Sequence, residues 1–278
     1  MEAIVSIKWT LARMYEPDIV IVDCRFLLGQ PDAGREAYEA SHIPGAVYLD
    51  LERDLSGALD EHGGRHPLPD PATLAHRLSQ AGISNESRVI AYDSQGGAMA
   101  SRLWWLMRYL GHEQVYVMDG GFPAWQEAGF PVTAEQRIVV PASFYAVVQH
   151  GMLAEVYDVQ AKLRQPGVAL VDSREAPRYR GEVEPIDPVA GHIPGAINRF
   201  WKDGLDEQGL FKSPEAQKER FADLEEAEEI IVYCGSGVTA CPNVLALQQA
   251  GFYNVKLYAG SWSDWISYSE NPVATGEE

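Results

Sequence analysis

The sequence predicts an α/β protein of two tandem domains, each a mainly parallel sheet flanked by helices on both faces. Three observations support this prediction: a set of motifs that occurs twice in the same order, short apolar runs typical of buried strands, and helical patterns between these runs. The 278 residues are enough for two ordinary domains, because domains usually span roughly 100–200 residues.

The internal repeat is visible in four pairs of segments. VDCR, SHIPGAV, VIAYD and GGFPAW of the first half return, in the same order, as VDSR, GHIPGAI, IIVYC and GSWSDW. The offset between matching residues falls from 150 at HIPGA to 141 at the next strand, so the first copy has nine additional residues, which we place in LSGALDEHGGRHPLP. We therefore predict a first domain over residues 1–134, a linker over 135–149 and a second domain over 150–278.

The apolar runs and the helical patterns alternate in each half. The runs are DIVIVD, RVIAYD and QVYVMD in the first half and VALVDS, EIIVYC and NVKLYA in the second. Helical patterns cover residues 71–82, 98–111, 213–224 and 239–251, and three of them close with a glycine placed as a C-cap. This alternation predicts parallel sheets covered on both faces. Ligands of such sheets bind beyond the carboxyl ends of the strands, where Cys234 lies.

The charge and the cysteine content exclude several classes of protein. Acidic residues outnumber basic ones by 40 to 22, and the net charge of −18 argues against a nucleic-acid or membrane partner. We find no export signal and no run of about 18 apolar residues. Three cysteines without a CxxC pair predict neither a disulfide framework nor a metal site, and they fit a cytoplasmic protein.

Cys234 is the candidate nucleophile. It follows the strand IIVY and precedes GSGVTA, which leads into a helix predicted to start near Thr239. Gly235 and Gly237 allow a tight turn whose N–H groups converge, and the start of a helix adds the positive end of its dipole. Such a cradle favours a reactive thiolate. The alternative is a buried cysteine without chemistry, but the matching residue of the first copy is Asp93, so the two loops differ in their chemistry.

The segments CGSGVTA, GGFPAW, GSWSDW and the two HIPGA copies resemble the tandem-domain rhodanese and 3-mercaptopyruvate sulfurtransferase family over nearly the whole chain. The resemblance implies two rhodanese-like domains, a non-catalytic first and a catalytic second. It implies that Cys234 takes sulfane sulfur from a small anionic donor as a persulfide. The sulfur then passes to a thiol, cyanide or thioredoxin-like acceptor, without a cofactor or metal. The persulfide would be held by backbone N–H groups of the loop, from Gly235, Gly237, Val238 and Thr239.

The resemblance also suggests the residues that choose the donor. Members that act on thiosulfate typically carry basic residues after the cysteine, whereas Gly235 and Ser236 resemble the mercaptopyruvate members. In those members the serine is linked to a histidine and an aspartate of the first domain, for which His42 and Asp32 are the candidates here. The alternative for His42 is a structural role in the HIPGA turn, as for His192.

Arg178, in APRYRGE, matches the family arginine that steers the anionic donor, and a planar guanidinium suits a carboxylate. Mercaptopyruvate members usually carry a second arginine shortly afterwards, where this chain has Ile186 and Asp187. We therefore favour 3-mercaptopyruvate as donor and keep thiosulfate sulfurtransferase, or a persulfide carrier or binding module, as alternatives. A cysteine phosphatase is excluded, because its C-x5-R loop requires an arginine where Ala240 stands.

Overall fold

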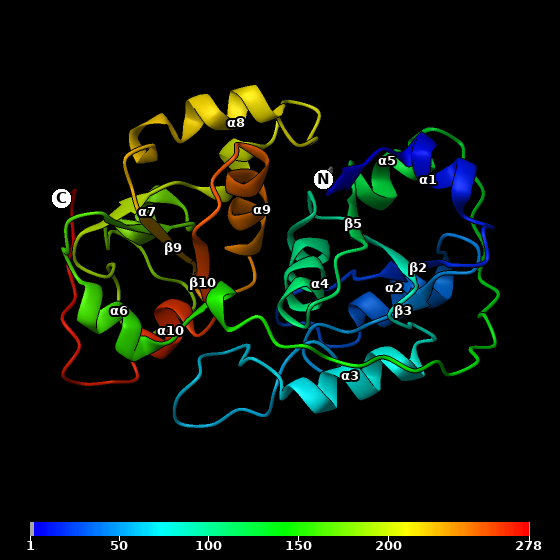
Figure 1. Ribbon diagram of the computed structural model, residues 1–278, viewed down its shortest axis with the longest axis horizontal. Helices are drawn as coiled ribbons and strands as arrows, with labels where there is room; N and C mark the ends of the chain where they lie inside the picture. The colour runs from blue at the N-terminus through cyan, green and yellow to red at the C-terminus, as the bar shows by residue number, and fades with distance from the viewer. Residues whose placement is uncertain (1–2, 278) are drawn as a thin grey trace. The chain divides into compact units, whose positions relative to one another are not determined.

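The computed structural model describes residues 3–277, and the chain forms two compact units (Figure 1). The first unit comprises Met1–Gly57, Pro69–Gln149 and Glu207–Phe211; the second comprises Ala58–Leu68, His150–Asp206 and Lys212–Glu278. Residues 135–149, predicted as a linker, thus belong to the first unit. The segment Ala58–Leu68, called the inserted segment below, lies in the stretch where we placed the nine additional residues, and it belongs to the second unit.

The first unit contains five parallel strands in the order β1-β5-β4-β2-β3. The strands are β1 (Ile4–Val5), β2 (Ile19–Asp23), β3 (Val47–Tyr48), β4 (Arg88–Tyr92) and β5 (Val115–Met118). The helices are α1 (Ile7–Arg13), α2 (Ala33–Ala40), α3 (Pro71–Gln80), α4 (Ala98–Tyr109) and α5 (Gly121–Glu127). The predicted runs and helical patterns of this half are confirmed, whereas β1, β3, α1, α2 and α5 carried too short a pattern to be predicted.

Strand β2 shows why this sheet is covered on both faces. All of its residues are buried. Ile19 and Ile21 join a core cluster with Tyr38 of α2 and Trp125 of α5. Helix α4 packs against β4 and β5 but contributes no residue to that cluster, so it covers the other face. Continuous burial of this kind is typical of parallel strands.

The second unit repeats the topology, with five parallel strands in the order β6-β10-β9-β7-β8. The strands are β6 (Leu153–Ala154), β7 (Val168–Asp172), β8 (Ala196–Asn198), β9 (Glu229–Tyr233) and β10 (Val255–Tyr258). The helices are α6 (Val156–Lys162), α7 (Ala176–Tyr179), α8 (Pro214–Arg220), α9 (Cys241–Gln249) and α10 (Ser261–Trp265). Short 3-10 turns cover His150–Met152, Trp201–Gly204 and Ala222–Leu224.

Helices again lie on both faces of this sheet. Trp262 and Trp265 of α10 pack with Ile231 and Tyr233 of β9 in one core cluster, and α9 packs against β9 and β10 without contributing to it. Figure 1 shows α6 and α10 on one side of these strands and α9 on the other. The carboxyl end of β9, which leads to Cys234, therefore opens at the edge of a sheet whose faces are both covered.

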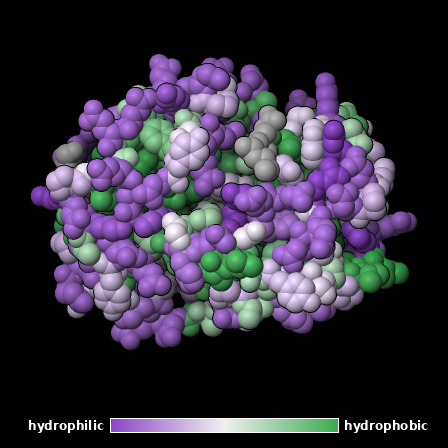
Figure 2. All heavy atoms as spheres, viewed as in Figure 1, coloured by the Kyte–Doolittle hydropathy of each residue, from purple (hydrophilic) through white to green (hydrophobic). Residues whose placement is uncertain are grey.

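The surface agrees with the composition. Figure 2 shows mostly hydrophilic residues on the visible face of the molecule, as expected for a chain with a net charge of −18. Within residues 3–277, no helix has the length and the apolar character needed to cross a membrane.

Candidate active site

Cys234 lies directly after β9, and its backbone is tied to the start of α10. Its N–H donates to Oγ of Ser261 over 3.1 Å, and its carbonyl oxygen accepts from the N–H of Trp262 over 3.0 Å. Ser261 has φ of +58°, a value that residues other than glycine rarely adopt. The matching residue of the first unit, Gly121, has φ of +55°. The second unit thus keeps a strained backbone position and uses its serine hydroxyl to hold the N–H of Cys234.

The loop after Cys234 is longer than predicted, because α9 begins at Cys241 and not near Thr239. Gly237 has φ of +76°, and a Cβ at this position would lie 2.1 Å from the carbonyl oxygen of Ala259. Only glycine fits there without displacing backbone. Val238, predicted as a persulfide-binding residue together with Thr239, is buried in the loop.

The other two cysteines have no comparable environment. Cys241 is buried at the first position of α9, and its Sγ donates to the carbonyl oxygen of Gly237 over 3.3 Å. Cys24 is buried in the first unit, where burial and the neighbouring carboxylates of Asp23 and Asp93 raise the pKa of its thiol well above the ordinary value. A thiol with a raised pKa is a poor nucleophile at neutral pH.

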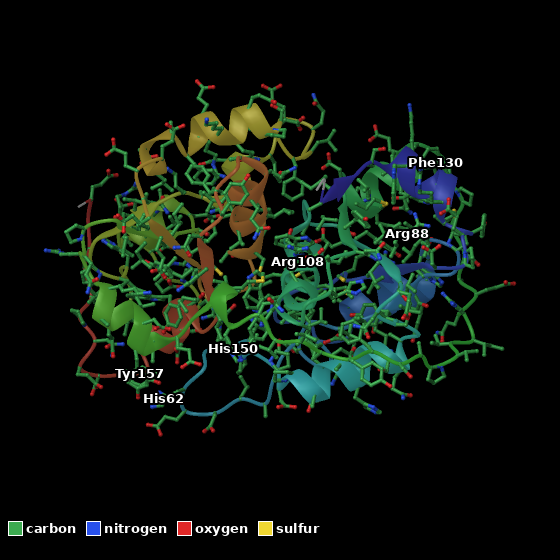
Figure 3. All side chains as sticks on the ribbon, viewed as in Figure 1. His62, Arg88, Arg108, Phe130, His150 and Tyr157 are labelled. Atoms are coloured by element: carbon green, nitrogen blue, oxygen red, sulfur yellow. The ribbon has the colours of Figure 1, made fainter. Side chains whose placement is uncertain are left out.

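The inserted segment packs against the loop of Cys234 and against α10. The N–H of Gly63 donates to Oδ1 of Asp264 over 2.7 Å, and the N–H of Arg65 donates to Oγ of Ser263 over 3.1 Å. His62, labelled in Figure 3, lies on the same segment and hydrogen-bonds through Nδ1 to a serine of the second unit over 2.7 Å. These contacts bring Arg65 and His66 to the loop.

Ser236 is hydrogen-bonded to His66. The distance between Ser236 Oγ and His66 Nδ1 is 2.8 Å, and both residues are buried. A serine and a histidine at this distance, two residues beyond a candidate nucleophile, form a pair that is able to move a proton. The resemblance implied a serine–histidine pair, and we had assigned its histidine to His42.

The structure gives His42 a structural role instead. Its Nδ1 lies 2.6 Å from the carbonyl oxygen of Tyr38 and its Nε2 lies 3.2 Å from that of Glu135, so backbone carbonyls occupy both ring nitrogens. His192 repeats the first of these contacts, with Nδ1 2.7 Å from the carbonyl oxygen of Tyr179. Because the same contact occurs in both units, the HIPGA histidines hold a turn, and the assignment of His42 to the relay is wrong.

Asp32 also has a different partner from the one that the relay requires. It is an exposed residue of the first unit, at the N-cap of α2, and it forms an ion pair with Arg53 over 2.7 Å. Among the described residues, the contacts of Asp32 give no link to Ser236 or His66. A signal that could have pointed to His66 is the difference between the two copies here: LDEHG of the first half is followed by GRH, whereas the matching LDEQG of the second half is followed by LFK.

Two guanidinium groups converge on the loop. A Cβ at Gly235 would lie 3.7 and 3.8 Å from Nη2 and Nη1 of Arg178, and 2.8 Å from Nη2 of Arg65. Arg178 was predicted to contact the donor, whereas Arg65 was missed. The missing second arginine of the mercaptopyruvate pattern is therefore matched in charge by an arginine from the inserted segment.

Two carboxylates partner these arginines. Glu184 accepts from Nη2 of Arg178 over 2.7 Å and from its Nε over 3.1 Å. Burial of Glu184 disfavours its charged form, but the hydrogen bonds from Arg178 and from backbone N–H groups outweigh burial and hold the pKa of this carboxyl below its ordinary value. Asp187 accepts from Arg178 over 3.2 Å and also forms an ion pair with Arg65.

The loop of the first unit shows what this kind of turn can bind. Asp93 stands at the position that Cys234 has in the second unit, and its carboxylate accepts four backbone N–H groups over 2.8–3.0 Å. The donors are Gln95, Gly97, Met99 and Ala100. Burial raises the pKa of Asp93, and these hydrogen bonds offset part of that rise. A strand, a glycine-containing turn and a helix thus form a cradle for negative charge in this fold.

Comparison with known proteins agrees with the family that the sequence motifs resemble. The profile of the rhodanese-like domain matches residues 6–128 and 155–268. The chain is 49% identical over 271 residues to a probable 3-mercaptopyruvate sulfurtransferase of Pseudomonas aeruginosa, covering 96% of this chain and 95% of the relative. It is 35% identical to the thiosulfate sulfurtransferase of Cricetulus griseus, covering 99% and 96%. The crystal structure of SseA from Escherichia coli, a 3-mercaptopyruvate sulfotransferase, matches with a TM-score of 0.83 and 33% identity, covering 95% of this chain and 100% of that one.

Two parallel α/β units, with a cysteine-bearing loop at one strand end, define a protein of the rhodanese type. The chain belongs to the tandem-domain rhodanese family of sulfurtransferases. This membership confirms the predicted fold class, two tandem rhodanese-like domains, and the predicted class of enzyme.

Proposed function

We propose that Cys234 carries sulfane sulfur as a persulfide, taking it from a small anionic donor and passing it to a thiol, cyanide or thioredoxin-like acceptor. The observation that carries the proposal is the position of Cys234 after β9, in the loop whose counterpart gathers four N–H groups around the Asp93 carboxylate. A thiolate or a persulfide carries the same negative charge as that carboxylate, and the N–H groups of Gly235, Gly237, Val238 and Thr239 are the candidates to hold it.

The reaction has two halves. In the first, the Cys234 thiolate attacks the donor sulfur. With 3-mercaptopyruvate the carbon–sulfur bond breaks, and its electron pair goes to the methylene carbon, which takes up a proton to give pyruvate. With thiosulfate the sulfur–sulfur bond breaks and sulfite leaves as a stable anion. In the second half, a thiolate or cyanide attacks the outer sulfur of the persulfide, and the Cys234 thiolate is restored.

The site favours 3-mercaptopyruvate as donor. The Ser236–His66 pair is placed to supply the proton that the pyruvate carbon requires, whereas sulfite needs none. Gly235 and Ser236 bring no charge to the loop, and Arg178 and Arg65 are partnered by Glu184 and Asp187. The convergence of two guanidiniums on Gly235 is the specific observation that keeps thiosulfate as the second candidate donor.

The first unit has a non-catalytic role in this proposal, because Asp93 occupies the position of the nucleophile and cannot form a persulfide. The three cysteines of the chain, Cys24, Cys234 and Cys241, are free thiols, which fits a reducing compartment, and we propose that the protein works in the cytoplasm.

The proposal is tested by sulfur loading of the purified protein. After incubation with either donor, the intact mass is expected to rise by about 32 Da per transferred sulfur, on the peptide that contains Cys234, and cyanide is expected to remove it as thiocyanate. Cys24 is a thiol of the first unit, so Cys24→Ser is the matched control, and this variant is expected to keep the gain in mass. Retention of full loading and turnover by Cys234→Ser would refute the proposal, whereas loading without turnover would identify a persulfide carrier.

A further inference from the structure

A chain of alternating charges runs from the buried end of β7 to the loop of Cys234. Arg174 contacts Asp172 over 2.6 Å and Glu184 over 3.4 Å. Arg178 contacts Glu184 over 2.7 Å and a second carboxylate, that of Asp187, over 3.2 Å. Asp187 then pairs with Arg65 of the inserted segment. Each cation in the chain thus lies beside an anion, and the last members reach Gly235.

Asp187 is the member of this chain that lies between the two guanidiniums at the loop. Its Oδ1 contacts Nη1 of Arg65 and its Oδ2 contacts Nη2 of Arg178, while the side chain is only 3% exposed. Both arginines also reach Gly235, the residue next to Cys234. An anion that binds beside Cys234 therefore shares its cations with a carboxylate that is already present.

We propose that Asp187 is a specificity-determining residue that sets the charge of the donor which the site accepts, favouring a monoanion over a dianion. The inference rests on the proposed function and goes beyond it, since it names the residue that separates 3-mercaptopyruvate from thiosulfate. Arg65, from the inserted segment, is the second guanidinium of the donor site.

The charge balance explains the selectivity. Arg65 and Arg178 supply two positive charges, and Glu184 and Asp187 supply two negative ones, so these four side chains together carry no net charge before a donor binds. A carboxylate donor can share the guanidinium groups with Glu184 and Asp187, because every guanidinium has five N–H donors. For a dianion both the attraction to the arginines and the repulsion from Asp187 double, so four side chains without net charge give it no electrostatic gain over a monoanion, while the dianion loses more hydration on binding.

The test is the ratio of kcat/KM for thiosulfate to kcat/KM for 3-mercaptopyruvate. Asp187→Asn keeps the shape of the side chain and removes its charge. Removing a charge several ångströms from a donor changes donor capture by roughly tenfold for each donor charge, so the ratio is expected to rise about tenfold. Glu182→Gln, which removes a charge from an exposed pair with Arg180, is the matched control and leaves the ratio unchanged.

Arg65→Gln changes the charge at the same site in the opposite direction. It tests whether the Arg65–Asp187 pair sets the donor preference even if Asp187→Asn folds poorly. The ratio is expected to fall in Arg65→Gln and to return toward the wild-type value in the double variant, because the two charges then cancel. An unchanged ratio in Arg65→Gln, or equal gains for both donors in Asp187→Asn, overturns the inference. If neither donor loads sulfur on wild-type Cys234, the proposed function is refuted instead, so the two failures are distinguishable.

Discussion

The Ser236–His66 pair makes a prediction that depends on the donor. His66→Ala removes the ring whose Nδ1 lies 2.8 Å from Ser236 Oγ, and it leaves a buried hydroxyl without that partner. Loss of such a hydrogen bond costs about 1–3 kcal/mol. Loss of a positioned proton donor typically costs about 10²–10⁴-fold in rate. We therefore expect kcat with 3-mercaptopyruvate to fall by about 10²-fold or more.

The same variant is expected to lose less than about tenfold with thiosulfate, because sulfite leaves without taking up a proton and only the position of the loop is disturbed. His66→Asn separates the two effects. Its amide places a polar atom near the position of Nδ1, so the loop keeps a hydrogen bond, but an amide does not transfer protons at neutral pH. We expect this variant to recover thiosulfate turnover and to remain slow with 3-mercaptopyruvate.

Single-turnover release of pyruvate and of sulfite measures the donor half-reaction directly. His42→Asn is the matched control, because His42 also uses Nδ1 in a buried hydrogen bond, of 2.6 Å to the carbonyl oxygen of Tyr38. It is expected to lower the free energy of unfolding by about 1–3 kcal/mol and to affect both donors alike. Equal losses with both donors in His66→Ala, or a donor-selective loss in His42→Asn, would refute the reasoning.

Two further predictions concern stability. In Gly237→Ala, the new Cβ would lie 2.1 Å from the carbonyl oxygen of Ala259. We therefore expect the free energy of unfolding, measured by urea titration, to fall by more than about 2 kcal/mol. A loss below about 0.5 kcal/mol would contradict the loop geometry. The pKa of Glu184 lies below its ordinary value of 4.5, so its charged form stabilises the fold above that pH, and the contribution is lost as the pH falls through the lowered pKa. Glu184→Gln is therefore expected to be less stable than the wild type at pH 7, with a difference that shrinks below about pH 4.5; a difference that is constant with pH would count against the ion pair with Arg178.

The sequence allowed the scaffold to be predicted because the repeat and the buried strands are local signals. Strands β2, β4, β7 and β9 are buried on both faces, so their composition alone identifies them. Cys234 could be placed at a strand end for the same reason. The short elements α7 and α10 were not predicted, because their position depends on packing in the core and not on a pattern of their own.

The partners of Cys234 could not be predicted in this way. Arg65 and His66 follow the motif LDEHG, whose second-half copy LDEQG is followed by Phe211 and Lys212, so the two positions differ between the copies and carry no repeated motif that would have drawn attention to them. His42 was chosen because its motif is distinctive. Yet a feature that recurs in both halves, as His42 and His192 do, is explained by what both halves share, which is the fold. In a duplicated protein, the residues present in one copy alone are the better candidates for chemistry.

The same argument applies to the charge of the site. The first unit fills its anion cradle with its own carboxylate, that of Asp93, which accepts hydrogen bonds from four backbone N–H groups. The second unit places a thiol there, and the inserted segment adds one positive charge, Arg65, which Asp187 offsets. A net charge of −18 therefore does not by itself prevent an anion from binding, because exposed charges are screened beyond about 10 Å whereas buried pairs at the loop are not. The balance of four partly or fully buried charged side chains, those of Arg65, Arg178, Glu184 and Asp187, decides which donor the site takes.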